Sequence, residues 1–380
     1  MLRARTPSRQ LSDSHRKPNV VAAALPAILA CTLFVLPSAC SDSVAPEHGG
    51  PPESASLAKG GGGGGPKASA KIIFTSSRDG NVEIYSMNAD GSAQTNLTNN
   101  AGSDGTPTVS TDGTLIAFES SRDGNPEVYV LDVATGTQTN VTNTAGYDAI
   151  PRLSPDGTKI AFFTARSGGA FVELWIMNSD GSDPRLASTA IRNAYYTSWS
   201  PDSRKLAFVG YQDGQSTNDV AVVDSSGTGV VWLTSDPGED LVPAWSPDGS
   251  KIAFVSGRNG HFDIYVVNST GGGETRLTDD TGNDIFPAWS PDASKIAFQS
   301  NRADPNGDVY VMNTDGSAQT RLTTSMFVDA GPAWSLDGRK LAFTSTRDGN
   351  SEVYVMNSGG AAEKNLTKNS GPDGGPVWTR

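Results

Sequence analysis

The stretch from Pro243 to Asn268 reads PAWSPDGSKIAFVSGRNGHFDIYVVN, and variants of it recur along almost the whole chain. Its triplet Ile252-Ala253-Phe254 has six counterparts, namely Ile72-Ile73-Phe74, Ile116-Ala117-Phe118, Ile160-Ala161-Phe162, Leu206-Ala207-Phe208, Ile296-Ala297-Phe298 and Leu341-Ala342-Phe343. Successive units lie 44 to 46 residues apart. A period of this length, filled with short apolar runs and turn signals, is typical of propeller blades.

Each unit reads as four short strands. The first contains the Ala-Trp-Ser segment, and Ser-Pro-Asp-Gly then predicts a tight turn, because Pro fixes φ and Gly permits positive φ. The second strand is KIAFVS and the third is DIYVVN, an apolar and β-branched run. The fourth ends in Leu-Thr, as at Leu277-Thr278. Short connections make the four strands an antiparallel sheet, whose two apolar faces must be covered by neighbouring sheets.

The two ends of the chain complement each other. The first unit begins at Lys71 with its second strand, while the chain stops after Pro376-Val377-Trp378-Thr379-Arg380, which is a first strand alone. We therefore expect an all-β fold: a seven-bladed β-propeller of four-stranded antiparallel blades, closed by the C-terminal strand completing blade one. Such closure removes the open edge of an unfinished ring.

The segment before the repeats has a different composition. Residues 1–18 are basic, Val20 to Leu36 is largely apolar, and Pro37-Ser38-Ala39 precede Cys40. This pattern resembles a bacterial lipoprotein signal peptide over residues 1–40, which would leave Cys40 lipidated. Ser41 after it resembles the signal for outer-membrane sorting, and the alternative is plain secretion of a soluble product. We expect residues 41–70, rich in Gly, Pro, Ser and Ala, to be a disordered tether, and 71–380 to be the propeller.

Composition narrows the classes of partner and site. The formal charge is −12, and −16 when residues 1–40 are left aside, which argues against nucleic acid as a partner. The only cysteines are Cys31 and Cys40, so the propeller offers neither a disulfide nor a thiolate metal site. One closed ring is compatible with a single domain of this length, and we expect a monomer.

Charged residues recur at fixed places between the second and third strands. An Arg follows the second strand in six units, with Gln212 as the exception, and an acid opens every third strand, as at Glu83 and Asp263. We expect these arginines and acids to pair across their hairpin. The Asp304, Asn306 and Asp308 spacing comes closest to a calcium loop, but Val309 stands where its Gly is expected. We therefore assign no metal or other cofactor.

A second set of acids lies in the loop that enters each first strand. It consists of Asp104, Asp148, Asp240, Asp284, Asp329 and Asp373, while the remaining unit has Ala194 with Asn193 before it. In a propeller this loop leads to the innermost strand, so these acids should crowd one mouth of the central channel. One interpretation is a local Asx turn, and the other is a ring of negative potential that attracts cationic groups.

The residues after these acids break the repeat symmetry. Entering blades three to six they are Ala149-Ile150, Tyr195-Tyr196, Leu241-Val242 and Ile285-Phe286, whereas blades seven, one and two have Ala330-Gly331, Gly374-Gly375 and Gly105-Thr106. Four neighbouring loops with apolar bulk indicate a contact patch, with Arg152 and Arg192 as a charged rim. Packing of each loop is the alternative. We select as ligand-binding residues the six aspartates together with Ile150, Tyr195, Tyr196, Val242 and Phe286.

The motifs Trp-Ser-Pro-Asp-Gly at Trp245 to Gly249 and Val-Tyr-Val-Met-Asn at Val309 to Asn313 resemble the TolB or PD40 propeller repeat, which is also similar to the propellers of prolyl-oligopeptidase-type peptidases. The resemblance covers 71–380 and implies a periplasmic binding platform. Unlike TolB, which carries an α/β domain before a six-bladed ring, this chain has a tether before seven units. A TolB-like channel mouth that binds peptides is the expectation.

Catalysis is the competing class. The peptidases need a hydrolase domain, for which no residues remain, and no Gly-x-Ser-x-Gly motif occurs. Oligogalacturonate lyases share a similar repeat, but their chemistry relies on several histidines around a metal, whereas only His48 and His261 follow residue 40. We identify no catalytic residue.

The hypothesis is an exported, lipid-anchored, non-enzymatic propeller in the periplasm or at the cell surface that binds a protein, a peptide or a cell-wall polymer. The alternative is a polysaccharide-active enzyme.

Overall fold

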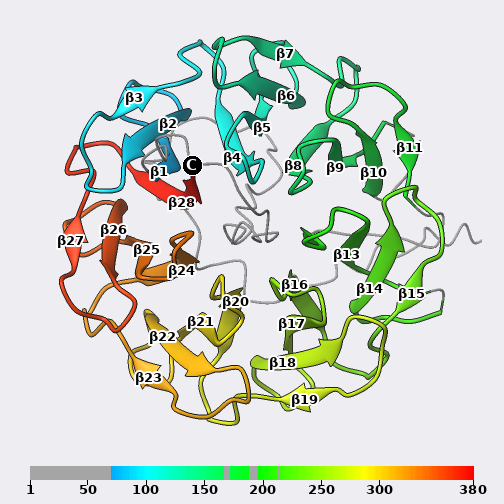
Figure 1. Ribbon diagram of the computed structural model, residues 1–380, viewed down its shortest axis with the longest axis vertical. Helices are drawn as coiled ribbons and strands as arrows, with labels where there is room; N and C mark the ends of the chain where they lie inside the picture. Colours follow the sequence, from blue (N-terminus) through cyan, green and yellow to red (C-terminus); the bar gives the residue numbers. More distant parts are fainter. Residues whose placement is uncertain (1–69, 167–171, 188–195, 213) are drawn as a thin grey trace, which may run out of the picture.

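The fold is a seven-bladed β-propeller. The computed structural model describes residues 70–166, 172–187, 196–212 and 214–380, and its strands form seven four-stranded antiparallel sheets arranged as a ring (Figure 1). The expected fold class is confirmed. The expected signal peptide with Cys40, over residues 1–40, and residues 41–69 of the expected tether lie outside the described residues.

The first strand of each blade lies nearest the centre and the second pairs with it. From blade one to blade seven, the first strands are β28 (Asp373–Thr379), β4 (Asp104–Val109), β8 (Asp148–Leu153), β12 (Thr197–Trp199), β16 (Asp240–Trp245), β20 (Asp284–Trp289) and β24 (Asp329–Trp334). The second strands are β1 (Lys71–Ser76), β5 (Leu115–Ser120), β9 (Lys159–Thr164), β13 (Lys205–Gly210), β17 (Lys251–Ser256), β21 (Lys295–Ser300) and β25 (Lys340–Ser345).

The third and fourth strands complete each blade toward the outside. The third strands are β2 (Glu83–Asn88), β6 (Glu127–Asp132), β10 (Glu173–Asn178), β14 (Asp219–Asp224), β18 (Asp263–Asn268), β22 (Asp308–Asn313) and β26 (Glu352–Asn357). The fourth strands are β3 (Thr95–Asn96), β7 (Gln138–Asn140), β11 (Arg185–Leu186), β15 (Val231–Trp232), β19 (Thr275–Arg276), β23 (Thr320–Arg321) and β27 (Lys364–Asn365). These outer edges are only two or three residues long, which limits edge-to-edge pairing with other chains.

The core lies between blades. The Phe of every second strand is completely enclosed, at 0% exposure, because alternate residues of a strand point to opposite faces and both faces are covered by neighbouring blades. One cluster contains Phe74 and Trp378 of blade one together with Val353 and Val355 of blade seven. Each blade therefore depends on the next for burial of its apolar faces.

Four tryptophan side chains on the first strands hydrogen-bond to the preceding blade. The indole Nε1 of Trp289 donates to the carbonyl oxygen of Ala244 at 3.0 Å, and Trp334 donates to Ala288 in the same way at 3.0 Å. Trp199 and Trp378 donate to Arg152 and Ala333 at 2.8 and 3.1 Å. Each bond runs from the Trp of one blade to the carbonyl of the residue before the Trp position in the preceding blade. It satisfies a buried indole N–H, which would otherwise destabilise the fold.

The ends of the chain meet in blade one. Strand β28 pairs antiparallel with β1, with Trp378 opposite Ile72 and Val377 opposite Ile73. The expected closure is confirmed. In the described residues no helix is long or apolar enough to cross a bilayer.

Candidate functional site

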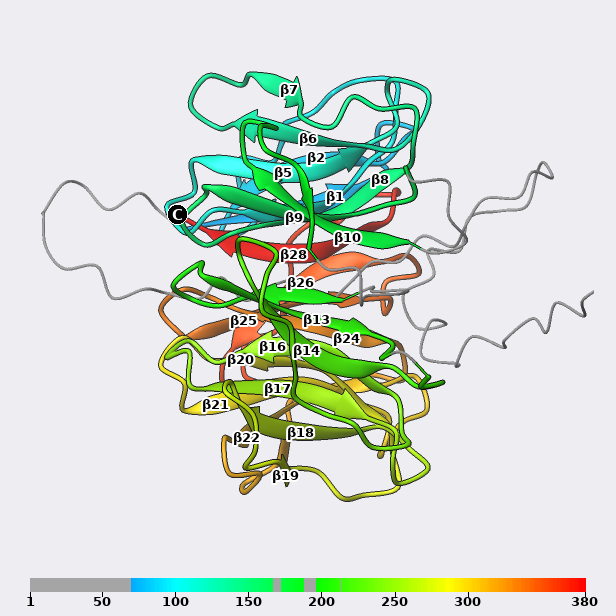
Figure 2. The same ribbon diagram turned by 90° about the vertical axis from the view of Figure 1, so that its right-hand side faces the viewer.

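The predicted aspartates open the first strands at one end of the ring. We call this end the entry face, and define it by two sets of loops, those from a fourth strand to the next first strand and those from a second to a third strand. Contacts join the two sets: Asn81 Nδ2 donates to a carbonyl of the neighbouring entry loop, and Ser77 N donates to Pro372 O at 3.0 Å. Figure 2 shows the ring from the side, with loops along both ends.

All six aspartates are completely enclosed, at 0% exposure. Each forms an ion pair with the arginine that follows the second strand of its own blade; the N–O distances are 3.1 Å for Arg78–Asp373, 3.1 Å for Arg122–Asp104, 3.0 Å for Arg166–Asp148, 3.2 Å for Arg258–Asp240, 2.7 Å for Arg302–Asp284 and 2.8 Å for Arg347–Asp329. The expectation of an accessible acidic rim is corrected, because these carboxylates face arginines inside the blades. Their role in ligand binding stays a prediction.

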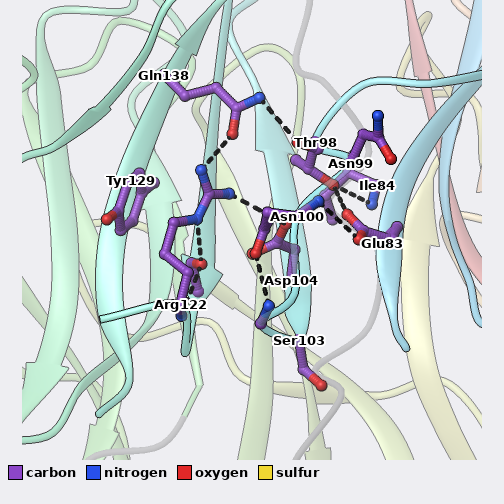
Figure 3. A network of polar contacts seen from close by, with 12 residues as sticks. Glu83, Ile84, Thr98, Asn99, Asn100, Ser103, Asp104, Arg122, Tyr129 and Gln138 are labelled. Carbon is purple, nitrogen blue, oxygen red and sulfur yellow. Dashed lines mark hydrogen bonds and ion pairs between the residues drawn. The ribbon is translucent and has the colours of Figure 1, made fainter. Parts of the chain in front are cut away.

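Blade two shows how the arginine is held (Figure 3). Arg122 donates from Nε to Ser120 Oγ at 2.8 Å, from Nη1 to Gln138 Oε1 at 2.6 Å and from Nη2 to Asp104 at 3.1 Å. Its guanidinium carbon lies 4.3 Å from the ring centre of Tyr129. A planar cation with several donors suits this combination of carboxylate, amide and aromatic face. We call this arrangement the arginine lock.

The hairpin pairing expected for these arginines is therefore wrong. The acids that open the third strands have other partners: Glu83 accepts hydrogen bonds from Asn81 Nδ2 at 2.8 Å and from the backbone of Asn100 at 3.0 Å, and it also accepts one from Thr98 Oγ1. In blades five and six the acid is a shorter Asp, and a fourth-strand Arg pairs with it, as in Arg276–Asp263 at 2.8 Å and Arg321–Asp308 at 2.7 Å. Asp308 thus already has a cationic partner in the calcium-like loop.

Burial dominates the protonation of two acids near the junction of blades four and five. Desolvation raises the pKa of Asp240 to about 7, although Ser256, Thr234 and Arg258 oppose the shift. Arg258 is shared with Asp236 and Glu274, so its charge stabilises Asp240 only in part. Desolvation likewise raises the pKa of Asp219 to about 6.

Blade four departs from the arginine lock in several positions at once. Gln212 replaces the Arg and Ala194 replaces the Asp. Ala221 stands where other blades have an aromatic residue, and Trp232 stands where five other blades have Asn or Arg and blade three has Leu186. Trp232 packs edge-on against Phe208, with ring centres 5.9 Å apart. Arg192, Asn193, Ala194 and Tyr195 lie outside the described residues.

The apolar side chains predicted at the mouth are not an exposed patch. Ile150, Val242 and Phe286 are 8%, 1% and 4% exposed, and Tyr196 packs partly buried against the cluster that contains Val242 and Phe286. The expectation of exposure is corrected, because these side chains turn into the blade interfaces.

The backbone at the same positions is unusual. The pairing of the first strand with the second shifts register there, as between Leu241 and Ala244, and the bulged residue has positive φ. These residues are Thr106 (49°), Ile150 (50°), Val242 (54°), Phe286 (56°), Gly331 (62°) and Gly375 (60°). Glycine adopts this conformation freely, whereas another residue pays about 1–2 kcal/mol. Four blades therefore keep a side chain where glycine would relieve strain.

The bulges lie on strands whose other edge is unpaired. Every first strand is the end of its sheet and borders the centre of the ring. Neighbouring blades use some of the bulge amides: Ile150 N donates to Glu119 at 3.2 Å and Gly375 N donates to Thr344 Oγ1 at 3.3 Å. Strained backbone beside unpaired strand edges is typical of ligand-binding positions.

Sequence reasoning missed a different set of accessible residues on the entry face. Met326 and Phe327 are 77% and 47% exposed, in the loop that enters blade seven. The signal was present in the sequence: two residues before the first-strand Asp, five other blades have glycine (Gly102, Gly146, Gly238, Gly282 and Gly371), where blade seven has Phe327.

His261 is held among charged side chains of blade five. His261 Nε2 lies 3.4 Å from Asp263 and 3.3 Å from Arg276 Nη2, so it belongs to an ion-pair cluster of blade five. Across the part of the chain that the structure describes, no group of three or more His, Cys, Asp or Glu side chains could hold a metal ion.

Comparisons with known proteins identify the repeat. The family model of the TolB beta propeller domain matches residues 65–189 and 158–326, and a comparison with curated proteins gave no match. Among solved structures, TolB from Acinetobacter baumannii has 20% identity and a TM-score of 0.57, over 82% of this chain and 66% of its own. An oligogalacturonate lyase from Vibrio parahaemolyticus has 18% identity and a TM-score of 0.62, over 76% and 86%.

A third similar structure is a puromycin-hydrolyzing peptidase of Mycobacterium tuberculosis, with 16% identity, a TM-score of 0.62 and coverage of 76% of this chain and 50% of its own. This chain thus spans just under two thirds of the TolB chain and half of the peptidase. At these identities the solved structures show a shared fold, and the whole activities of those proteins are not transferred by it.

Proposed function

Since the chain belongs to the TolB beta propeller domain family, we propose that it is a non-enzymatic binding platform of the cell envelope. Its ligand is a protein segment or an envelope polymer, and the binding position is the channel mouth at the entry face. Export to the periplasm or cell surface, with lipid attachment at Cys40 to the outer membrane, is part of this proposal. It rests on the sequence of residues 1–40.

One observation carries the proposed site. Ile150, Val242 and Phe286, in blades three, five and six, hold left-handed backbone where blades seven and one use glycine, and Thr106 of blade two does so with a smaller polar side chain. The strain at the three apolar positions is the observation on which the site rests. Their side chains fix the shape of the bulges by packing inward. The bulges then offer backbone groups on unpaired strand edges to a ligand, while the arginine locks hold each strand start in place.

The experiment compares partners retained by the wild type and by a Val242→Gly/Phe286→Gly variant. Glycine keeps the left-handed backbone but removes the packing that orders the bulge, so we expect partner binding to fall at least tenfold. Ala293→Gly is the matched control, because Ala293 also has positive φ, 56°, in a turn at the opposite end of the ring. Unchanged partners in the mouth variant, with folding intact by circular dichroism, would remove the mouth from consideration.

The second candidate is a polysaccharide-active enzyme. It is favoured by the similarity to the oligogalacturonate lyase fold, which extends over 86% of that chain. Incubation with oligouronides, with the absorbance of unsaturated products as the readout, separates the two candidates. The binding platform predicts no product with or without added divalent metal, and product formation that follows protein concentration would favour the enzyme.

A further inference from the structure

The loop that enters blade seven presents two apolar side chains to solvent. Met326 is 77% exposed and Phe327 is 47% exposed, which makes them the only adjacent pair of exposed large apolar residues among the described residues. The corresponding loops of other blades carry mostly small and polar residues, and the loop that enters blade three has a single exposed aromatic residue, Tyr147, at 38%. Exposed neighbouring apolar groups of this size favour burial against a partner.

Phe327 stands where a side chain does not fit the usual loop path. A Cβ added to the equivalent Gly102 would lie 2.5 Å from Arg122 N, and one added to Gly282 would lie 2.7 Å from the backbone of Arg302. The blade-seven loop takes a different path. Asn306 Nδ2 donates to Met326 O at 2.8 Å, whereas the equivalent Asn81 and Asn125 donate to the carbonyls of Gly102 and Gly146 in the loops that enter blades two and three.

This altered loop is firmly attached. Ser325 Oγ donates to Asp329 at 3.0 Å, and Val328 N donates to Thr346 Oγ1 at 3.2 Å while Thr346 N donates back to Val328 O at 3.1 Å. The two apolar side chains are therefore held outward by a bonded backbone. The bonds to Thr346 place them beside the loop that carries Asp348.

Asp348 begins an arc of exposed carboxylates. The residue after the lock arginine is Asp348, Asp79 and Asp123 in the adjacent blades seven, one and two, and all three are exposed, whereas blades five and six have Asn259 and Ala303. Each Asp accepts hydrogen bonds from a Tyr hydroxyl and an Asn amide, which lower its pKa. These carboxylates are thus fixed in place and ionised.

We propose that Met326 and Phe327, together with the carboxylate arc of Asp348, Asp79 and Asp123, form a docking surface for a protein segment that carries an apolar anchor flanked by lysine or arginine. The charge complementarity selects the partner, because the fixed anion of Asp348 beside the apolar pair, followed by Asp79 and Asp123 in the next two blades, attracts cations and repels anionic lipid or acidic polymer. This inference deepens the proposed binding function and rests on it, and it names the chemistry of the ligand.

The test uses a labelled synthetic peptide with two central phenylalanines flanked by lysines, and the full-length protein. We expect wild-type binding that weakens with salt, and a loss of about tenfold or more for Met326→Ser/Phe327→Gly, since this variant removes both apolar side chains that the peptide would bury. Phe327→Gly introduces the residue that five other blades carry at this position, so folding should be unaffected.

A triple variant, Asp79→Asn/Asp123→Asn/Asp348→Asn, tests the charge. It should weaken peptide binding about tenfold at low salt and much less at high salt. The matched control is Asp90→Asn/Asp180→Asn/Asp315→Asn. These exposed acids are likewise held by hydrogen bonds, in their case from serine, but they lie in turns at the opposite end of the ring. The control should bind like the wild type.

Three outcomes would overturn the inference: equal binding of a peptide with glutamate in place of lysine, unchanged binding by both entry-face variants, or stronger binding to anionic lipid vesicles than to the peptide. The proposed function is tested separately by the Val242→Gly/Phe286→Gly variant with its own partners. If that variant loses partners while the basic peptide does not bind the wild type, the docking surface is wrong and the binding platform stands.

Discussion

At the scale of single residues, one arginine organises each of six blades. Arg122 contacts a serine, a glutamine, a buried aspartate and two aromatic rings at once. The aspartate opens the first strand and the arginine follows the second, so the ion pair fixes the end of this strand pair. A buried carboxylate without this cation would be strongly destabilising.

Removing both partners of the arginine lock should therefore lower the free energy of unfolding by less than the sum of the two single losses. We expect Arg122→Gln alone to lower the free energy of unfolding by about 3–5 kcal/mol, because Asp104 stays buried without its cationic partner and, among the described residues, keeps only the hydrogen bond from Asn100 Nδ2. The double variant Arg122→Gln/Asp104→Ala copies the Gln212 and Ala194 combination of blade four, and should lose less than the two single variants together. Urea denaturation measures all three.

The control for this cycle is Arg339→Ala, since the Arg339 side chain is 85% exposed and its removal should change stability by no more than about 0.5 kcal/mol. Additive losses in the double variant would contradict the lock as a coupled pair.

The raised pKa of Asp240 predicts a pH dependence with a definite sign. In the unfolded chain this carboxyl has a pKa of about 3.9, whereas its pKa in the fold is about 7. Between these values the folded chain holds a proton that unfolding releases, so stability falls as pH rises from about 4 to about 7. Asp219, with a pKa of about 6, acts in the same direction.

Asp240→Asn removes the titration while keeping a neutral side chain. Between pH 5 and pH 7, urea denaturation should show a steeper loss of stability in the wild type than in the variant, by up to about 1.4 kcal/mol per pH unit. A wild type that gains stability relative to the variant over this range would contradict the raised pKa.

At the scale of elements, strand β28 differs from the other first strands because it comes from the opposite end of the chain to the rest of its blade. It pairs with the edge of β1, and its Trp378 donates a hydrogen bond to Ala333 O of blade seven. It thus contributes to two blades that are far apart in sequence. The other first strands are joined to their blades by a short turn of the chain itself.

Removal of β28 should open the ring. Truncation after residue 372 exposes the edge of β1 and the cluster around Phe74, so we expect loss of cooperative unfolding and aggregation. Placing residues 371–380 directly before residue 70 instead gives blade one a continuous hairpin and should retain the fold. Thermal denaturation followed by circular dichroism distinguishes the two chains, and a truncated chain that unfolds like the wild type would contradict the role of β28.

At the scale of the whole molecule, ring closure leaves few ways to associate. The outer strands have two or three residues, and the inner edges border the enclosed centre. The net negative charge adds repulsion between copies. We therefore expect a monomer by light scattering at low and high salt; a stable dimer would require an interface on the loop faces, with the exposed Met326 and Phe327 as the first position to examine.

The sequence by itself determined the number of blades, the strands within each blade and the closure of the ring, because a repeated pattern of apolar residues and turns allows one solution that buries both faces of every sheet. Only the tertiary structure decided which acid each arginine meets, since the sequence offers both the third-strand acid and the first-strand Asp as partners and the fold places the first-strand Asp against the guanidinium. It also decided accessibility: Val242 and Phe286 turn inward on left-handed bulges, whereas Met326 and Phe327 face solvent, and side-chain direction at a bulge depends on register and on the neighbouring blade.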